Sequence, residues 1–258
     1  MMIHLYSDLH LEWGHGWTLP RDLPGDLVIL AGDIITFNNF GILERFLQGW
    51  DKPVIFVPGN HEYYTKIPMV EAAKEFRSWL AKTLPHVILL TDMPVSLGGI
   101  HFFGGTMWTN FDNKNATAME YARNSMNDFC LIHKAAQEIF TPEASVVLHK
   151  KFKKKLVEWF ENDLAGPRIV ISHHAPVIGA HTRFDGSPLV PAFNSLDMLP
   201  LIEKYQPDYW FYGHTHECDE QQVGKTKIIS NQRGYPRGVG HYECEGFEPD
   251  GQSIQVSF

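Results

Sequence analysis

Short apolar runs recur along the chain and predict the strands of its fold. Each run is rich in Val, Ile and aromatic residues, and continuous apolar runs of this kind are typical of strands buried on both faces. The runs cover residues 2–6, 27–30, 54–57, 87–90, 100–103, 169–171 and 209–212. Further on, residues 219–223 and 227–230 flank Gly224, which predicts a hairpin, and a last strand is expected over 253–258.

Amphipathic patterns between these runs predict helices. They lie near residues 40–48, 68–82, 142–162 and 196–205, and in the first of them Leu43, Phe46 and Leu47 share one face. Strands that alternate with helices indicate an α/β layered fold. No clean boundary divides the chain, so a single domain over residues 1–258 is expected. Residues 107–140 have weak periodicity and many Asn, and we interpret them as an insertion or a lid over the site.

Composition narrows the classes of protein to which the chain can belong. It has 258 residues, of which 44% are apolar, and 14 of the residues are His. The net charge of −8 disfavours the broad contact with a nucleic-acid backbone that a basic surface gives, but a nucleotide substrate stays open. Three Cys without a CxxC pair favour a reducing compartment and no disulfide framework. Because we find no signal peptide and no apolar run of about 18 residues, we expect a cytoplasmic protein that does not cross a membrane.

A lysine-rich stretch over residues 150–155 lies within the third predicted helix. The helical periodicity places these lysines away from the apolar positions, which predicts a solvated helix face. A basic docking patch is the alternative interpretation.

Metal-capable side chains follow five of the predicted strands. They are Asp8 and His10, Asp33, Asn60 and His61 with Glu62, His173 and His174, and His214 with His216. The loops beyond the carboxyl ends of neighbouring strands in an α/β sheet meet, so these distant residues are expected at one point. Gly32, Gly59 and Gly213 precede three of the groups and allow close backbone approach. Each group alone is weak evidence, but all five in this order predict a metal site.

This set of residues resembles the calcineurin-type metallophosphoesterases. The motifs of that family are DxH, GD, GNH with a following acidic residue, a lone His after a strand, and GHxH, and the chain has all of them in order between residues 8 and 216. The resemblance implies a two-sheet β-sandwich flanked by helices, in four α/β/β/α layers. It also implies two divalent or trivalent metal ions, and mixed nitrogen and oxygen ligands suit Mn, Fe, Zn or Co.

The resemblance further implies which residues hold each ion. One metal is expected to bind Asp8, His10, Asp33 and His216, and the other Asp33, Asn60, His173 and His214. Asp33 therefore bridges the two ions, and His61 lies near the phosphate without binding a metal.

One ligand is ambiguous, because His173 and His174 are adjacent. Neighbouring side chains point apart at a strand end, and His173 fits the family motif better, so we prefer it as the ligand. His174 is then expected to contact the substrate or to support the ligands.

The expected reaction is hydrolysis of a phosphomonoester or a phosphodiester. Two metals about 3.5–4 Å apart clamp the attacking and leaving oxygens and acidify a bound water. In-line attack by a metal-bound hydroxide, without a phosphoenzyme, is therefore expected. His61 is the expected catalyst, which protonates the leaving oxygen or stabilises its charge. Small molecules, nucleotides, phosphoproteins and nucleic-acid ends stay open as substrates.

Substrate contacts are less well indicated. The candidates are Asn60, which could touch both a metal and the phosphate, His174 and Arg233. Arg233 and Arg237 follow the last ligands, and Arg suits bidentate phosphate binding, although an exposed turn is the simpler interpretation. The aromatic side chains of Trp108, Tyr63 and Tyr64 are interpreted either as a wall for a base or as core.

Two other classes of function are open. A non-catalytic metal-binding scaffold could use the same fold, but every expected ligand position is filled, which argues against it. A mononuclear metallohydrolase would bind one metal per chain. The pair Asn60 and His61, together with His214 and His216, weighs against that class.

Overall fold

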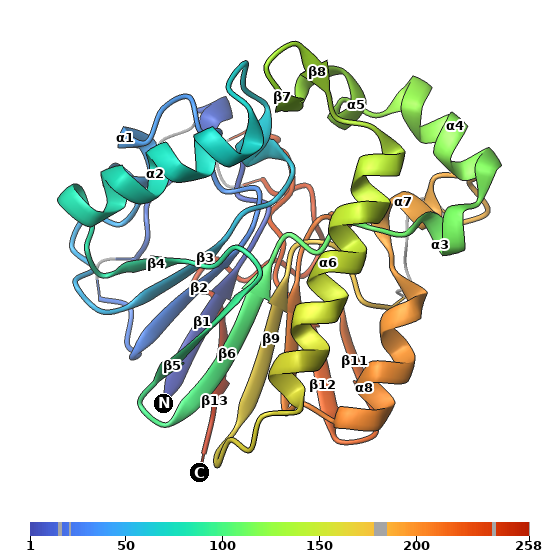
Figure 1. The fold of residues 1–258 in the computed structure, drawn as a ribbon. Helices are drawn as coiled ribbons and strands as arrows, with labels where there is room; N and C mark the ends of the chain where they lie inside the picture. The colour runs from blue at the N-terminus through green and yellow to red at the C-terminus, as the bar shows by residue number, and fades with distance from the viewer. Residues whose placement is uncertain (15–16, 21, 178–184, 239–240, 258) are drawn as a thin grey trace.

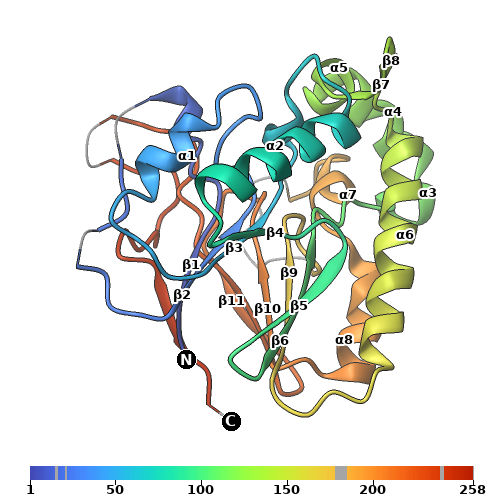
Figure 2. The ribbon, with the colours of Figure 1, turned by 60° about the vertical axis from the view of Figure 1, so that its left-hand side comes forward.

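The computed structural model describes residues 1–14, 17–20, 22–177, 185–238 and 241–257. Two β-sheets pack face to face, and helices cover both outer faces (Figure 1). The four-layer α/β/β/α prediction is confirmed. The N- and C-terminal ends lie together at one end of this sandwich in both views (Figures 1 and 2).

The first sheet contains the strands predicted from the N-terminal apolar runs. Its order is β13 (Gln252–Gln255), β1 (Met2–Tyr6), β2 (Leu27–Ala31), β3 (Val54–Val57) and β4 (Val87–Leu89). Strands β1 to β4 are parallel, whereas β13 pairs with β1 in the antiparallel direction. The last strand thus ends before the predicted 253–258 span does, and Phe258 lies outside the described residues.

The second sheet has a parallel centre and an antiparallel strand at each edge. Its order is β11 (Glu220–Val223), β12 (Thr226–Ser230), β10 (Tyr209–Tyr212), β9 (Arg168–Ser172), β6 (Ile100–Gly105) and β5 (Met93–Leu97). The pair of β11 and β12 confirms the predicted hairpin around Gly224. Because β12, β10, β9 and β6 are parallel, their carboxyl ends share one edge.

Apolar side chains from both sheets fill the space between them. This cluster includes Ile3, Leu5, Ile29, Ile55 and Val57 of the first sheet with Phe102, Ile169, Ile171 and Phe211 of the second, all fully or almost fully buried. A strand that is covered on both faces has a continuous run of apolar residues in its sequence. This is the pattern from which the strands were predicted.

Helices form the two outer layers. Helices α1 (Gly41–Phe46) and α2 (Met69–Thr83) cover the first sheet, where Leu43, Phe46 and Phe76 are buried. Helices α6 (Pro142–Phe160) and α8 (Leu199–Tyr205) cover the second sheet. All four lie within or close to the predicted spans.

Several elements were not predicted. Strand β5 is mostly exposed and contains Pro94, so it lacks the apolar run that marked the other strands. Its hairpin with β6 turns at Gly98 and Gly99, both with positive φ. The short elements η1 (Leu11–Trp13), η2 (His61–Tyr63) and α7 (Val190–Phe193) were also missed, whereas η3 (Leu196–Met198) lies within the helix predicted over residues 196–205.

The segment predicted as an insertion or lid forms its own small group of elements. It contains α3 (Phe111–Lys114), α4 (Ala116–Ser125), α5 (Asp128–Leu131), β7 (His133–Ala135) and β8 (Glu138–Ile139). They gather at the end of the sandwich opposite the termini (Figures 1 and 2). Since β1 starts beside the N-terminus, its carboxyl end points toward this group. Whether the segment acts as a lid stays a prediction.

Two expectations from composition can be compared with the fold. The three Cys are free thiols, in agreement with the predicted lack of a disulfide framework. Among the described residues, no helix combines the length and the apolar character needed to cross a bilayer.

Candidate metal centre

The predicted ligands lie in loops that follow parallel strands. Asp8 and His10 follow β1, Asp33 follows β2, Asn60 follows β3, His173 follows β9, and His214 and His216 follow β10. The first three strands belong to one sheet and the last two to the other, so the residues meet across the sandwich. Burial is nearly complete for the three residues Asp8, Asp33 and His173.

The backbone of these loops is strained at the candidate ligands. Positive φ angles between 45° and 73° occur at Asp8, His10, Asp33, His214 and His216. A left-handed conformation costs a residue with a Cβ about 1–2 kcal/mol, and such strain is typical of functional sites. The tight turns aim the side chains back over the ends of the strands.

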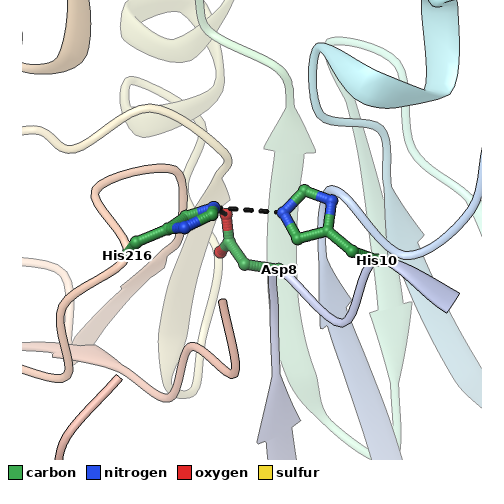
Figure 3. A group of neighbouring side chains, drawn as sticks. All are labelled: Asp8, His10 and His216. Carbon is green, nitrogen blue, oxygen red and sulfur yellow. Dashed lines mark hydrogen bonds and ion pairs between the residues drawn. The ribbon is translucent and has the colours of Figure 1, made fainter. Parts of the chain in front are cut away.

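The first cluster comprises Asp8, His10 and His216 (Figure 3). The two imidazole Nε2 atoms of His10 and His216 are 3.0 Å apart, and His216 Nε2 lies 3.5 Å from Asp8 Oδ1. The Nδ1 atoms of both rings face carboxylates, Glu12 for His10 at 3.5 Å and Glu243 for His216 at 2.8 Å. These carboxylates favour the tautomer that keeps Nε2 free for a metal.

The second cluster comprises Asp33, Asn60, His173 and His214. Its distances are short: His173 Nε2 lies 3.3 Å from Asp33 Oδ1, 3.0 Å from Asn60 Oδ1 and 3.2 Å from His214 Nδ1. His173 Nδ1 donates to the carbonyl of Ala31 at 2.9 Å, so Nε2 is the atom that faces the cluster. Burial, followed by the neighbouring His174 and His173, holds the pKa of His214 well below its usual range, so that ring is neutral.

Asp33 lies between the two clusters. Its Oδ1 faces His173, and its Oδ2 lies 3.9 Å from His10 Nε2. The backbone N–H of His61 donates to Oδ1 at 2.9 Å and fixes the carboxylate. One carboxylate oxygen is therefore directed toward each cluster, as bridging of two ions requires.

The spacing of the donor atoms fits bound cations. Two neighbouring ligands of an octahedral ion with bonds of about 2.1 Å lie about 3.0 Å apart, which is the distance between His10 Nε2 and His216 Nε2. Without a cation, two such lone pairs would repel one another. Although burial opposes the charge, Asp33 raises the pKa of His173 to about 10. The proton on His173 occupies the position where a metal cation would bind. Binding of a metal would release this proton, as metal binding does at protonated ligands.

His61 lies beside both clusters. Its Nε2 is 3.9 Å from Asp33 Oδ2, and its Nδ1 is 3.2 Å from Glu12 Oε1. His61 also lies within ligand distance of His10 and Asp33, so proximity alone does not separate it from the metal ligands. Burial lowers its pKa, but the carboxylates of Asp33 and Glu12 outweigh burial and raise the pKa to about 9.

The geometry distinguishes His173 from His174. His173 lies among Asp33, Asn60 and His214, whereas His174 belongs to none of the clusters of potential ligands among the described residues. The ring of His174 packs instead against His214, with centroids 4.1 Å apart, and its Nδ1 faces the carbonyl of Thr106 at 3.2 Å. Burial and the neighbouring His173 lower its pKa to about 3. His174 is thus a neutral ring that packs against a candidate ligand and is not one of the ligands.

Asn60 is held by the segment predicted as a lid. Its Nδ2 donates to Asp128 Oδ1 at 2.8 Å and to Tyr64 OH at 3.0 Å, and Tyr64 OH donates to the same carboxylate oxygen at 2.6 Å. Both amide hydrogens are then used, and Oδ1 points at His173. The predicted contact of the Asn60 amide with substrate therefore has no free N–H in this arrangement.

Glu62 fixes the two loops that carry Asp33 and Asn60. Its buried carboxylate accepts backbone hydrogen bonds from Asp33 at 2.9 Å, Ile34 at 2.8 Å, Ile35 at 3.1 Å and Gly59 at 2.6 Å. Glu62, the acidic residue of the GNHE motif, thus fixes the backbone of the two loops and does not itself act as a ligand.

Gly59 lets the β2 and β3 loops approach. A Cβ on Gly59 would lie 2.6 Å from the Asp33 backbone nitrogen and 2.7 Å from His173 Nε2. Real Cβ contacts are longer than this, so any side chain here would push the ligands apart.

The structure does not bring Arg233 into the site. Its guanidinium is buried, donates to the carbonyl of Leu9 at 2.9 Å, and lies over the rings of Trp17 and Tyr242. Arg233 therefore supports the loop between Asp8 and His10. The exposed Arg237 pairs with Glu243 at 3.0 Å.

The three aromatic candidates have different positions. Tyr64 lines the cleft at the metal residues, whereas Tyr63 and Trp108 are buried in the core. The cleft has a volume of about 160 Å³, and part of its wall comes from Met126, Asn127 and Asp128 of the segment predicted as a lid.

Several residues of the site were missed by sequence reasoning. They are Glu12, Asp128, Tyr235 and Glu243. The OH of Tyr235 lies 3.4 Å from His61 Nε2, and its ring covers His10 and His216 at centroid distances of 4.6 Å each. Glu12 alone had a sequence signal, because it lies two residues after His10; the others come from segments without a motif.

Comparisons with known proteins show the family to which the chain belongs. The sequence profile of the calcineurin-like phosphoesterases matches residues 1–218. An uncharacterized protein of Acanthamoeba polyphaga mimivirus is 29% identical over 280 residues, covering 96% of this chain and 94% of that protein.

Two solved structures of phosphoesterases are similar to this chain to different degrees. The phosphopantetheinyl hydrolase of Mycobacterium tuberculosis has a TM-score of 0.65 at 17% identity, covering 92% of this chain and 90% of that one. A dimetal phosphatase from Danio rerio has a TM-score of 0.49 at 13% identity, covering 89% of this chain and 86% of that one. The first of these likenesses supports the fold and does not identify a substrate.

Proposed function

The chain belongs to the calcineurin-like phosphoesterase family, and from this premise we propose that it hydrolyses a phosphate ester with two metal ions. The observation that carries the proposal is the position of Asp33, whose two carboxylate oxygens face two separate clusters of donors. A mononuclear site would need only one of these clusters.

Each ion would be held by four side chains of this protein. Asp8, His10, Asp33 and His216 would hold one ion, and Asp33, Asn60, His173 and His214 the other. Nitrogen and oxygen donors in this mixture suit Mn, Fe, Zn or Co. When bound, the two ions would neutralise the phosphate charge and lower the pKa of a water molecule, which can then attack phosphorus in line with the leaving oxygen.

His61 would act on the leaving group. Its Nδ1 faces Glu12, so Nε2 is the atom directed toward the cleft. A raised pKa keeps the ring protonated at neutral pH, and a protonated His61 can donate its Nε2 proton to the leaving oxygen. The OH of Tyr235, at 3.4 Å, would help to orient the ring.

Asp128 and Tyr64 would act through Asn60. They hold its amide group so that Oδ1 points at the second cluster, and this would reduce the reorganisation needed when a metal binds. The role of the segment over residues 107–140 would then be to orient Asn60 as well as to form a wall of the cleft.

Turnover of two chromogenic esters tests the proposal. The purified protein would be loaded with Mn, Fe, Zn or Co and assayed with p-nitrophenyl phosphate and with its bis-ester. Hydrolysis of either ester, with close to two metals per chain, supports the proposal. Metal binding without turnover of these esters or of a wider panel would favour the scaffold. A panel of nucleotides, phosphopeptides and a phosphopantetheinyl ester would then define the substrate class; the last is included because of the named hydrolase.

A further inference from the structure

A second cleft adjoins the segment over residues 60–63: Tyr63 lines it, whereas Asn60 and His61 line the cleft at the metal residues. The second cleft runs between α2 and α6, which cover different sheets (Figure 1), and we call it the α2–α6 cleft. Among its lining residues are Lys74 and Arg77 of α2 and Lys151 and Lys155 of α6. None of its lining residues lines the cleft at the metal residues.

One half of this cleft is strongly basic. It has a volume of about 340 Å³ and is lined by four cationic side chains and one acidic side chain, Asp92. This balance is opposite to the net charge of −8 of the chain. Lysines of the stretch over residues 150–155 contribute two of the cations.

The cations in this half outnumber the carboxylates. Arg77 donates to the carbonyl of Leu89 at 3.1 Å and to Thr91 Oγ1 at 3.0 Å, and Lys155 donates to the carbonyl of Asp92 at 3.0 Å. These acceptors are neutral. The one carboxylate of this half, Asp92, interacts electrostatically with Lys155 and Lys151 and offsets one of the four positive charges. Neither Lys74 nor Lys151 forms an ion pair with another residue within the described ranges.

The other half of the cleft is apolar. It has a volume of about 340 Å³ and shares Met69, Val70 and Leu148 with the basic half. Val70 of α2 and Val147 of α6 line it and are 73% and 64% exposed. Its two charged lining residues, Lys134 and Glu143, pair with Glu138 and Arg123 at 2.7 Å and 2.6 Å. Apolar surface beside an excess of cations matches a ligand with an apolar body and an anionic head.

We propose that the α2–α6 cleft binds a small organic anion, with its phosphate, sulfonate or carboxylate head near Lys151 and Lys155 and its apolar body against Val70 and Leu148. The two halves have the volume of ordinary small-molecule sites, which favours such a ligand over a protein partner. Tyr63 and Trp108 form the inner wall of the cleft. Since the Trp108 ring lies 5.4 Å from that of His174, this ligand would sit one layer behind the metal centre.

The test uses anilinonaphthalene sulfonate, a fluorescent probe with an apolar body and one anionic head. Its binding to the native protein would be followed by fluorescence titration, with the uncharged N-phenyl-1-naphthylamine as the comparison. Saturable binding of the sulfonate at one site per chain is expected. The double variant Lys151→Gln/Lys155→Gln should weaken it at least ten-fold and leave the affinity for the uncharged compound unchanged.

The matched control is Lys150→Gln/Lys154→Gln. It removes the same charge from the same helix, but neither residue lines the cleft, so the affinity should change less than two-fold. A third variant, Val70→Glu, alters an exposed residue and places a carboxylate between the halves, which should also weaken sulfonate binding. Equal weakening by both lysine pairs would show a general charge effect and overturn the proposal. So would binding that neither Val70→Glu nor the Lys151→Gln/Lys155→Gln pair alters, because the probe would then lie elsewhere.

Discussion

The Nε2 atoms of His10 and His216 face each other at 3.0 Å, although the two residues are 206 positions apart in the chain (Figure 3). Each ring is held from behind by a carboxylate at Nδ1, Glu12 for His10 and Glu243 for His216. Either a proton or a metal cation between them removes the repulsion of the two lone pairs. Asp8 Oδ1, 3.5 Å from His216 Nε2, adds the negative charge that such a cation needs.

His61 and His216 should respond differently to replacement by Ala. His216→Ala removes a ligand, so the protein should lose metal from the first cluster together with its activity. His61→Ala should retain both metals and lose about 10²–10⁴-fold in kcat, because a general acid typically contributes that much. Metal content by mass spectrometry and kcat on one ester distinguish the two. Equal metal loss in both variants would show that His61 is a ligand.

Asp33→Ala should be the most damaging single change at the centre. The variant removes the one side chain that faces both clusters, so both ions should bind more weakly and not one alone. Titration of the metal-free variant with Mn would measure the two affinities. Asp8→Ala is the comparison, since its carboxylate belongs to the first cluster only. Two tightly bound ions in Asp33→Ala would refute the bridging role.

Asp128→Asn should weaken the second metal site without removing a ligand. The substituted amide can no longer accept as strongly from both Asn60 Nδ2 and Tyr64 OH, so Asn60 loses its fixed orientation. Loss of such support typically lowers metal affinity by about 10–100-fold. Glu120→Gln, a change of the same kind on the exposed face of α4, should have no effect. The idea fails if Asp128→Asn binds two metals with unchanged affinity.

Glu12→Gln should change the pH dependence of turnover. Burial lowers the pKa of His61, but Asp33 and Glu12 raise it above the usual value, so removal of the Glu12 charge lowers it. A general acid works in its protonated form, which is lost as pH rises through its pKa. The alkaline limb of the kcat profile should therefore move to lower pH in the variant. Because Glu12 also faces His10, metal content must be measured in parallel; an unmoved limb at full metal content would contradict the role of His61.

Gly59→Ala should disrupt the centre through packing alone. Its Cβ would lie 2.7 Å from His173 Nε2, and the resulting shift of the β3 loop should cost about 1–3 kcal/mol of stability and reduce metal binding. Gly41→Ala is the matched control: neither glycine has a positive φ, and the nearest atom to a Cβ on Gly41 is 3.5 Å away. Urea unfolding and metal titration of both variants give the comparison. Normal metal binding in Gly59→Ala would show that the loops can separate without loss of the site.

The sequence by itself determined most of the layers and the order of the candidate ligands. Strands such as β1 to β3 are covered on both faces, so each appears as an unbroken apolar run. Because β1, β2, β3, β9 and β10 all run in parallel within their sheets, the residues after them were expected to converge, and the structure brings them together. Strand β5 escaped notice because an exposed edge strand carries no such run.

Only the tertiary structure decided which side chains support those ligands. Asp128 and Glu243 lie in segments without a motif, and each meets its partner through contacts between residues distant in the chain, Asn60 and His216. In the same way, the periodicity of α6 did not indicate that residues of α2 line a cleft together with Lys151 and Lys155. The periodicity of a sequence indicates which face of a helix or strand is buried. It does not report which loop or helix comes to lie opposite, because that depends on the packing of the whole sandwich.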